Sequence, residues 1–239
     1  AGIADAYILM AAYALVDPDS AYSEARTAAA RAIDIDESLA EAHASLGLVR
    51  WHHRRDIEGA EEEFLRTIAL NPSYVRARHW YALYLANLER FEEALAQIEA
   101  ARSLDPVSLI VNAAVGLVYY YAGRYDEALE QCRKTLELDD QFFPAYTVRG
   151  RAYTMKGMYP EAVEAYERVI ERSGRRSSVL SLMIHPVAAS GDTQRAEALY
   201  GELRSRSSIE YISHFDMAVA AVALVRGSEA LESLELACD

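Results

Sequence analysis

Apolar residues recur along this chain at intervals of three and four residues, the spacing of one face of an α-helix. In one stretch, Ala94, Leu95, Ile98 and Ala101 follow this pattern. The pattern itself returns every 34 residues, in a row of alanines: Ala60, Ala94, Ala128, Ala162, Ala196 and Ala230. Four positions after each alanine comes a second row: Phe64, Ile98, Cys132, Tyr166, Tyr200 and Leu234. A fixed period of this length predicts a stack of repeated helical units.

Each period is punctuated in the same way, which predicts two helices per unit. A small residue lies upstream of the alanine, in the row Gly47, Ala82, Gly116 and Gly150. Where two helices cross, a small residue lets their axes approach to about 8–10 Å. Turn residues recur within the units, in the row Glu89, Gly123, Gly157 and Gly191. Pro72 and Pro106 end the second helix of their units, because proline cannot continue a helix.

The predicted fold is therefore all-α, with about seven antiparallel helix hairpins in a single domain, 1–239. The predicted units are 1–39, 40–73, 74–107, 108–141, 142–175, 176–209 and 210–239. The predicted first helices are 3–15, 40–53, 74–87, 108–121, 142–155, 177–190 and 212–224. The predicted second helices are one that ends near Ile35, then 57–70, 91–103, 125–138, 159–171, 193–204 and 227–237.

The first unit and the last two depart from the regular pattern. In the first unit we expect a longer loop containing Asp17, Pro18, Asp19 and Ser20. In the sixth unit Pro186 falls inside a predicted first helix, which indicates a local kink. In the last unit the turn glycine is missing near Val225. The chain begins in mid-pattern and without Met, so we expect the parent protein to continue at least on the N-terminal side.

Composition narrows the classes of partner. The net charge is −13, which argues against nucleic acid and against an anionic membrane surface, since both need clustered Lys and Arg. No run of about 18 apolar residues is present that would span a bilayer. Cys132 and Cys238 are far apart, which favours free thiols in a reducing compartment, the cytoplasm.

Three segments carry the repeat best: HWYALYLANLERFEEALAQIEAARSLDP, LVYYYAGRYDEALEQCRKTLELDD and GRAYTMKGMYPEAVEAYERVIE. In its period and its small–small–bulky–proline order, nearly the whole chain resembles the tetratricopeptide-repeat family. The resemblance implies a right-handed superhelical solenoid whose first helices line a concave groove. Units 40–138 are also similar to the repeat arrays of bacterial multidomain signalling proteins, such as winged-helix regulators, nucleotide cyclases and protein kinases. That similarity implies a regulatory part of a larger bacterial protein.

The resemblance also implies which side chains line the groove. They are Leu48, Trp51, Arg76, His79, Trp80, Leu83, Asn87, Leu117, Tyr120, Tyr121, Arg151 and Thr154. Some family members hold a peptide's terminal carboxylate with Lys, Arg and Asn in this groove, but the matching positions here are mostly Ala, Leu and aromatic. The set predicts an apolar, aromatic channel that suits a peptide or partner segment. The alternative for several aromatics, Trp80 above all, is a place in the core between repeats.

Other candidate chemistry has simpler explanations. His43, His52 and His53 lack the spacing of a metal site, so we expect them to be solvated or to cap helices, and we expect no metal or cofactor. The acidic run 61–63 favours a solvated helix face near a helix start. No phosphate-binding loop or nucleophile elbow occurs, so we expect no enzyme.

The leading hypothesis is a protein-interaction module that binds a peptide or partner segment. A second hypothesis is a regulatory domain whose groove senses a small ligand or the protein's own segment. A third is a homo-oligomeric scaffold that associates through the terminal repeats. The sequence does not name the partner.

Overall fold

The computed structural model describes residues 1–12, 16–54 and 56–238, and of residues 12, 54 and 238 it describes the backbone alone. This part of the chain contains fourteen α-helices and no strand. The free thiol predicted at Cys238 lies outside the described side chains. The chain divides into two compact units, Ala1–Ala122 and Gly123–Asp239. The single-domain organisation stays a prediction.

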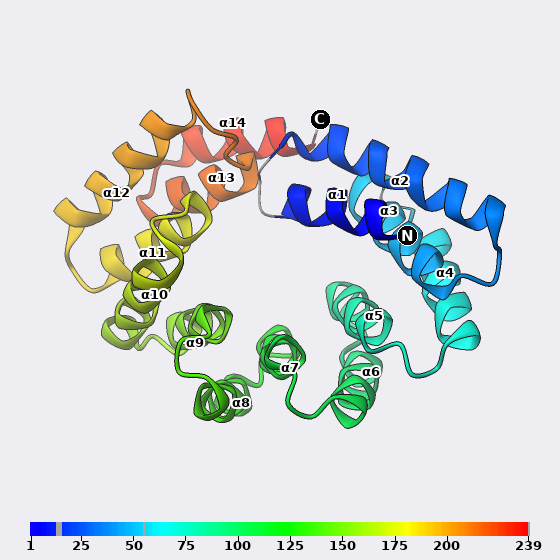
Figure 1. The fold of residues 1–239 in the computed structure, drawn as a ribbon. Coiled ribbons are helices and arrows are strands. Elements are labelled where there is room, and N and C mark those ends of the chain that lie inside the picture. Colours follow the sequence, from blue (N-terminus) through cyan, green and yellow to red (C-terminus); the bar gives the residue numbers. More distant parts are fainter. Residues whose placement is uncertain (13–15, 55, 239) are drawn as a thin grey trace. The chain divides into compact units, whose positions relative to one another are not determined.

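The first compact unit contains seven helices, which follow one another as hairpins (Figure 1). They are α1 (Gly2–Ala12), α2 (Pro18–Ile35), α3 (Ala40–Arg54), α4 (Ile57–Leu70), α5 (Val75–Asn87), α6 (Phe91–Leu104) and α7 (Leu109–Tyr121). The second unit contains α8 (Tyr125–Leu138), α9 (Phe143–Met155), α10 (Tyr159–Ser173), α11 (Ser177–Ala189), α12 (Thr193–Arg206), α13 (His214–Ala223) and α14 (Gly227–Cys238). Every predicted helix is present, and the bounds differ by few residues.

The helices pack in one repeated scheme, which curves each unit. A second helix packs on the next first helix, as α4 does on α5 and α10 on α11. First helices also contact one another, α3 with α5 and α9 with α11. Across the described residues, second helices make no such contacts with one another. Within each unit the first helices therefore lie on the inside of the curve, and Figure 1 shows this for α5 and α6.

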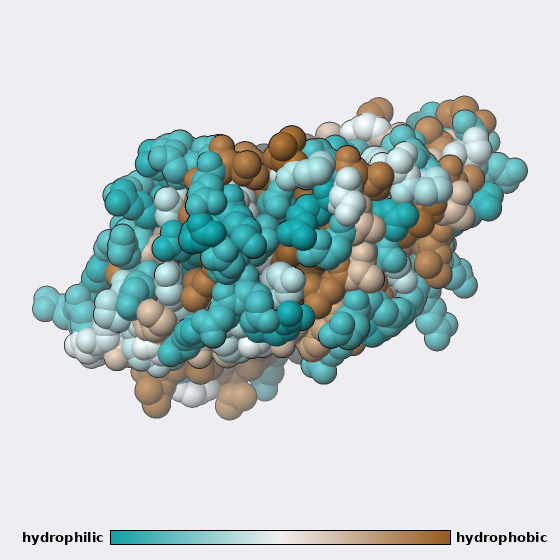
Figure 2. Space-filling view, turned by 90° about the horizontal axis from the view of Figure 1, so that it is seen from below, coloured by the Kyte–Doolittle hydropathy of each residue, from teal (hydrophilic) through white to brown (hydrophobic). Residues whose placement is uncertain are grey.

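The two rows found in the sequence form the centres of these junctions. The six alanines from Ala60 to Ala230 are all buried. In the next row, the Phe64 ring lies 5.6 Å from the rings of Tyr81 and Tyr84 on the following first helix. Fully burying a side chain of this size contributes about 2–3 kcal/mol. In the view of Figure 2 hydrophilic residues cover most of the surface around separate hydrophobic patches.

The residues that recur at the hairpin turns share one backbone conformation. Glu89 (φ 59°), Gly123, Gly157 and Gly191 lie at the predicted turns, and all four have positive φ. Val225 takes the same place in the last hairpin, with φ 59°. A β-branched residue is strained in this left-handed region. The missing glycine thus leaves the turn conformation unchanged and makes the last turn more costly.

Arginine at these turns links neighbouring repeats. The guanidinium of Arg90 pairs with Glu93 in its own second helix and with Glu61 in the preceding one, each at 2.7 Å. Arg226 makes the same two contacts in the last repeat, with Glu229 at 2.8 Å and with Glu197 at 2.7 Å. Both arginines are about one-third exposed, so each bridge is partly shielded from solvent.

One local expectation from the sequence needs correction. The residues 17–20 do not extend a loop, because Pro18 begins α2 and Asp17 caps it by accepting from the Ser20 amide at 2.9 Å. Proline suits the first turn, where its missing N–H would have no helical partner. Helix α11 continues through Pro186 to Ala189, and the kink expected at Pro186 stays a prediction. Each described helix is also too short or too polar to cross a bilayer.

Candidate peptide-binding face

The first helices of the first unit bring three polar side chains together on the inner side of the curve. Arg76 on α5 donates to Asp5 Oδ2 on α1 at 2.5 Å. Ser45 on α3 lies between these helices in the stack and donates to the other carboxylate oxygen of Asp5 at 2.7 Å. The Asp5 side chain is 17% exposed and that of Arg76 is 49% exposed. Asp5 is thus committed to internal partners, while Arg76 still reaches solvent.

Arg76 is oriented by its neighbours on α5. Its guanidinium carbon lies 5.6 Å from the centre of the Trp80 ring, within cation–π range. Trp80 is half-buried and packs against the core of the first unit. Burial, together with the positive charge of Arg76, lowers the pKa of His79 to about 4. At neutral pH this face therefore presents a cation, a neutral imidazole and a half-buried indole.

A second aromatic group lies on α3. Trp51 is half-buried and meets the Tyr84 ring edge-on at 5.8 Å between ring centres. Its ring centre lies 4.2 Å from that of His52, and His52 stacks on Tyr22 at 5.8 Å. The histidines here pack against aromatic rings. No group of three or more metal-ligating side chains occurs among the residues that the structure describes.

The other predicted residues of the first unit divide between core and surface. Leu48 is buried in the core, and Leu83 packs against it. Asn87 and Tyr121 are exposed, and the Tyr120 and Tyr121 ring centres lie 5.5 Å apart. Leu117 is half-buried. The aromatic and charged members of the predicted set thus reach the surface, whereas its aliphatic members contribute mainly to packing.

Arg151 and Thr154 belong to α9 in the second unit. Thr154 donates to the Gly150 carbonyl at 2.7 Å, so its hydroxyl is used within the helix. The Nε atom of Arg151 is buried and has no hydrogen-bond partner among the described residues. Burial raises the pKa of Asp216 on α13, against the opposing effects of Ser181 and Arg151. An arginine, a serine and an aspartate therefore recur here without the direct ion pair of Asp5 and Arg76.

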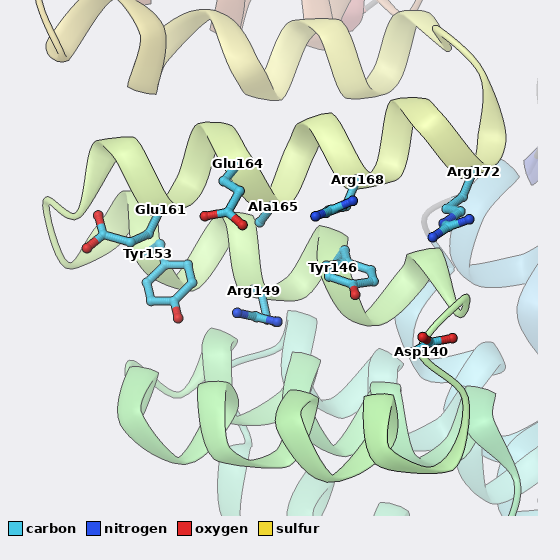
Figure 3. A pocket seen from close by; sticks show the side chains of 9 residues that line it. All are labelled: Asp140, Tyr146, Arg149, Tyr153, Glu161, Glu164, Ala165, Arg168 and Arg172. Atoms are coloured by element: carbon cyan, nitrogen blue, oxygen red, sulfur yellow. The ribbon is translucent and has the colours of Figure 1, made fainter.

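The second unit also has a pocket of about 360 Å³ between α9 and α10. It is lined by Asp140, Tyr146, Arg149, Tyr153, Glu161, Glu164, Ala165, Arg168 and Arg172 (Figure 3). The Arg149 guanidinium lies 5.6 Å from the Tyr146 ring centre and 5.7 Å from that of Tyr153. Arg168 pairs with Glu171 at 3.1 Å, whereas the described residues include no ion pair of Arg149 or Arg172. The pocket therefore offers two guanidinium groups to a ligand, beside the carboxylates of Asp140, Glu161 and Glu164.

Two stretches, residues 54–108 and 114–176, match the family model of the tetratricopeptide repeat. Solved structures of similar fold include tetratricopeptide-repeat proteins. A tetratricopeptide-repeat protein from Parabacteroides merdae has a TM-score of 0.67 and 14% identity, over 99% of this chain and 93% of that one. This is a tetratricopeptide-repeat protein.

Other solved tetratricopeptide-like folds are similar over comparable lengths. PilW, a type IV pilus biogenesis factor, has a TM-score of 0.67 and 18% identity, over 91% of this chain and 97% of that one. PilF of Pseudomonas aeruginosa has a TM-score of 0.60 and 22% identity, over 90% and 95%. At these identities the similarity shows the fold alone. No curated protein matches the sequence. Tetratricopeptide repeats form modules for protein–protein interaction and typically act as non-catalytic scaffolds.

Several acidic and histidine side chains of this tetratricopeptide-repeat protein are structural, which corrects the prediction of a solvated acidic face and of a solvated or helix-capping His43. His43 is buried, and its two ring nitrogens meet a Glu63 carboxylate oxygen at 2.7 Å and the Glu37 carbonyl at 3.0 Å. Glu61 accepts from the Tyr81 hydroxyl at 2.8 Å. Cys132 is buried, and burial raises the pKa of its thiol to about 12, so it is unreactive.

Sequence reasoning missed the partners of the predicted groove residues and the whole pocket. Asp5 lies in the irregular first unit, and no repeat position marked it as facing Arg76. The pocket residues of α9, Tyr146, Arg149 and Tyr153, recur at helical spacing, and that spacing was the available signal. From the sequence alone, this spacing could not be distinguished from that of residues that simply pack between helices.

Proposed function

We propose that this protein binds a segment of a partner protein along the first helices of its first unit, with Arg76 and Trp80 as the principal contacts. The observation that carries the proposal is the placement of Arg76. Asp5 fixes one edge of the guanidinium and Trp80 lies beneath it, while about half of the side chain remains exposed.

Such a surface matches the chemistry of a peptide. A guanidinium has five N–H donors, and Asp5 uses few of them. The remaining donors suit a carbonyl or carboxylate oxygen of the partner. Trp80 and Trp51 offer partly exposed aromatic surface to an apolar side chain nearby, and Trp and Arg are enriched among residues that dominate binding energy. The proposed occupant is a segment that carries an acceptor group next to an apolar side chain.

The test begins with a displayed peptide library selected on the intact protein, followed by calorimetry with the selected peptides. Arg76→Ala and Trp80→Ala should each weaken binding by about tenfold or more, the range of a binding hot spot. Arg133→Ala is the matched control, because Arg133 is an exposed arginine on α8 that pairs with two glutamates of its own helix. Peptides that bind all three variants as tightly as the wild type would refute the proposal.

A second candidate function, ligand sensing, is favoured by the pocket in the second unit. A guanidinium between two tyrosine rings, with no competing ion pair in the described part of the chain, suits a small molecule with a carboxylate or phosphate group. Thermal-shift measurements with a panel of such metabolites would test it. A ligand that stabilises the wild type should fail to stabilise Arg149→Ala and should still stabilise Arg133→Ala.

The resemblance to repeat arrays of signalling proteins supports a regulatory role for the module within a larger bacterial protein. The full-length gene product tests this point: an adjoining effector domain, with an output altered by Arg76→Ala, would support it. An output that does not change when the partner peptide is added would contradict it.

A further inference from the structure

The pocket between α9 and α10 carries charges of both signs in equal number. Three of its lining residues are arginines and three are carboxylates. Along α10 the acidic residues Glu161 and Glu164 come first, and Arg168 and Arg172 follow at intervals of one helical turn. In Figure 3 the two glutamates lie toward one end of the pocket and Arg172 at the other, with Arg149 of α9 between them. The formal charges of the pocket therefore cancel, but the two signs are separated along it.

These opposite charges face one pocket without neutralising one another. The described residues include no ion pair and no side-chain hydrogen bond of Arg149, Glu161 or Glu164. Arg149 is held instead by two aromatic rings, since its guanidinium carbon lies 5.6 Å from the centre of the Tyr146 ring and 5.7 Å from that of Tyr153. An ion pair needs nitrogen and oxygen within about 4 Å. The guanidinium and the two carboxylates are thus kept apart across the pocket, each without a partner of opposite charge.

Two other charged groups of the pocket are already engaged by the protein. Arg168 pairs with a glutamate of its own helix at 3.1 Å. Asp140 accepts from the side-chain amide of Gln141 at 2.6 Å. The groups left for a ligand are therefore the Arg149 guanidinium and the two glutamate carboxylates of α10, with Arg172 at the basic end.

This arrangement favours a ligand that carries both charges over a simple ion. A plain anion would meet Arg149, but it would also lie beside two carboxylates of like charge, which opposes binding. A plain cation would meet the carboxylates and would be repelled by the guanidinium groups in the same way. The volume of about 360 Å³ is near the low end of small-molecule sites, which hold about 300–1,000 Å³. The pocket therefore suits a small molecule with one group of each charge.

We propose that this pocket binds a small zwitterion, an amino acid or a short peptide, with its carboxylate on Arg149 and its ammonium group on Glu161 and Glu164. The inference rests on the ligand-sensing function proposed for the pocket and names the class of ligand. A guanidinium can donate two parallel N–H bonds to one carboxylate, and an ammonium group has three donors for the glutamate oxygens. The rings of Tyr146 and Tyr153 keep the guanidinium in place for this contact.

The experiment begins with thermal-shift measurements on the intact protein. The panel contains the common free amino acids, a set of dipeptides and, as plain anions, acetate, succinate and inorganic phosphate. A free amino acid or a dipeptide should raise the melting temperature more than any plain anion does, and the comparison of these two arms gives the size of the ligand. Calorimetry then compares the best compound with its N-acetyl derivative, which keeps the carboxylate, and its carboxamide, which keeps the ammonium group. Each derivative should bind about tenfold or more weakly, since each loses one charge-assisted contact.

Removing the acidic end of the pocket should act in opposite directions on the two kinds of ligand. A variant with both Glu161→Gln and Glu164→Gln should bind the zwitterion about tenfold or more weakly. It should bind the N-acetyl derivative at least as tightly as the wild type does, because the repulsion of the carboxylate is gone. Glu167→Gln is the matched control, because Glu167 lies on α10 outside the pocket lining and pairs with Arg195 at 2.8 Å. Circular dichroism verifies that the variants are folded.

The outcomes separate this inference from the ligand-sensing function on which it rests. An N-acetyl derivative that binds the wild type as tightly as its parent compound would overturn the zwitterion and leave ligand sensing standing. The same holds for a panel in which the plain anions bind and the amino acids and dipeptides do not. If no compound of either class binds, both proposals for the pocket are wrong.

Discussion

Asp5 and Arg76 form an ion pair although 71 residues separate them in the sequence. The pair joins α1 to α5 across α3, whose Ser45 completes the set by donating to the same carboxylate. Most inter-repeat contacts in this protein join adjacent hairpins, whereas this one spans three first helices. It therefore stabilises the curve of the first unit and, at the same time, fixes the arginine that we propose as a binding contact.

Removing the charge of Asp5 tests this double role. Asp5→Asn should destabilise the first unit by about 1 kcal/mol, a value discounted because the Arg76 side chain is half exposed. Urea unfolding followed by Trp fluorescence measures the change, since Trp80 lies beneath Arg76. Glu137→Gln is the control, because its pair with Arg133 lies on one helix with both side chains more than half exposed. Equal effects of the two substitutions would contradict the role given to Asp5.

The repeat pattern in the sequence predicts the helices, but it does not predict a contact such as the Asp5–Arg76 ion pair. The 34-residue rows predicted the helices that follow the irregular first unit, because each row must meet its neighbour for the repeat to bury any core. The resemblance to the family assigned Arg76 and Trp80 to the groove, and that assignment stays a prediction. The rows could not pair Asp5 with Arg76, because the first repeat has an altered spacing and its register against α5 depends on tertiary packing. Leu48 was assigned to the groove by position, yet its long side chain turns into the core.

His79 gives the face around Arg76 a pH dependence. Its ordinary pKa of 6.5 applies to the unfolded chain, and in the folded chain the pKa is about 4. Between these values the unfolded chain binds a proton at His79 and the folded chain does not, so stability falls as the pH falls through this window. The loss should be on the order of 2 kcal/mol at pH 4.

The measurement is chemical unfolding at several pH values, with NMR titration of the imidazole ring. His79→Gln should flatten the fall in stability between pH 6.5 and 4. His214→Gln, which changes an exposed histidine on α13, should leave the profile as it is. A ring titration near 6.5 in the folded protein would show that Arg76 and burial do not act on His79 as described.

Two glycines inside helices should respond in opposite ways to substitution by alanine: one variant should lose stability and the other should gain it. A Cβ atom at Gly150 would lie 2.6 Å from the buried ring of Tyr166 in the paired helix, so Gly150→Ala should cost about 1–3 kcal/mol through overpacking. Gly201 lies within α12 and a Cβ there meets no atom within 4 Å. Gly201→Ala should therefore stabilise the protein by about 0.5–1 kcal/mol. Thermal unfolding of both variants measures these changes in stability. If Gly150→Ala did not change the stability, α9 and α10 would have to move apart readily.

Asp216 offers the opposite pH dependence to His79. Burial raises its pKa above the ordinary 3.8, while the Ser181 hydroxyl at 3.3 Å and the charge of Arg151 act against this. Above pH 3.8 the folded chain holds this proton more tightly than the unfolded chain, so stability falls as the pH rises through the raised pKa. Asparagine imitates the protonated form. Asp216→Asn should therefore stabilise the second unit at neutral pH, and the gain should shrink as the pH approaches 3.8.

Unfolding curves of wild type and Asp216→Asn from pH 7.5 to 3.8 test this sign, with Glu232→Gln on the exposed face of α14 as the control. The hydroxyl of Ser181 already donates to the Ser178 carbonyl at 3.0 Å, so it cannot donate fully to the Asp216 carboxylate as well. A protonated Asp216 removes this conflict by donating to Ser181 itself. If Asp216→Asn were less stable than the wild type at neutral pH, attraction to Arg151 would outweigh burial, and the second unit would contain a working equivalent of the Asp5–Arg76 pair.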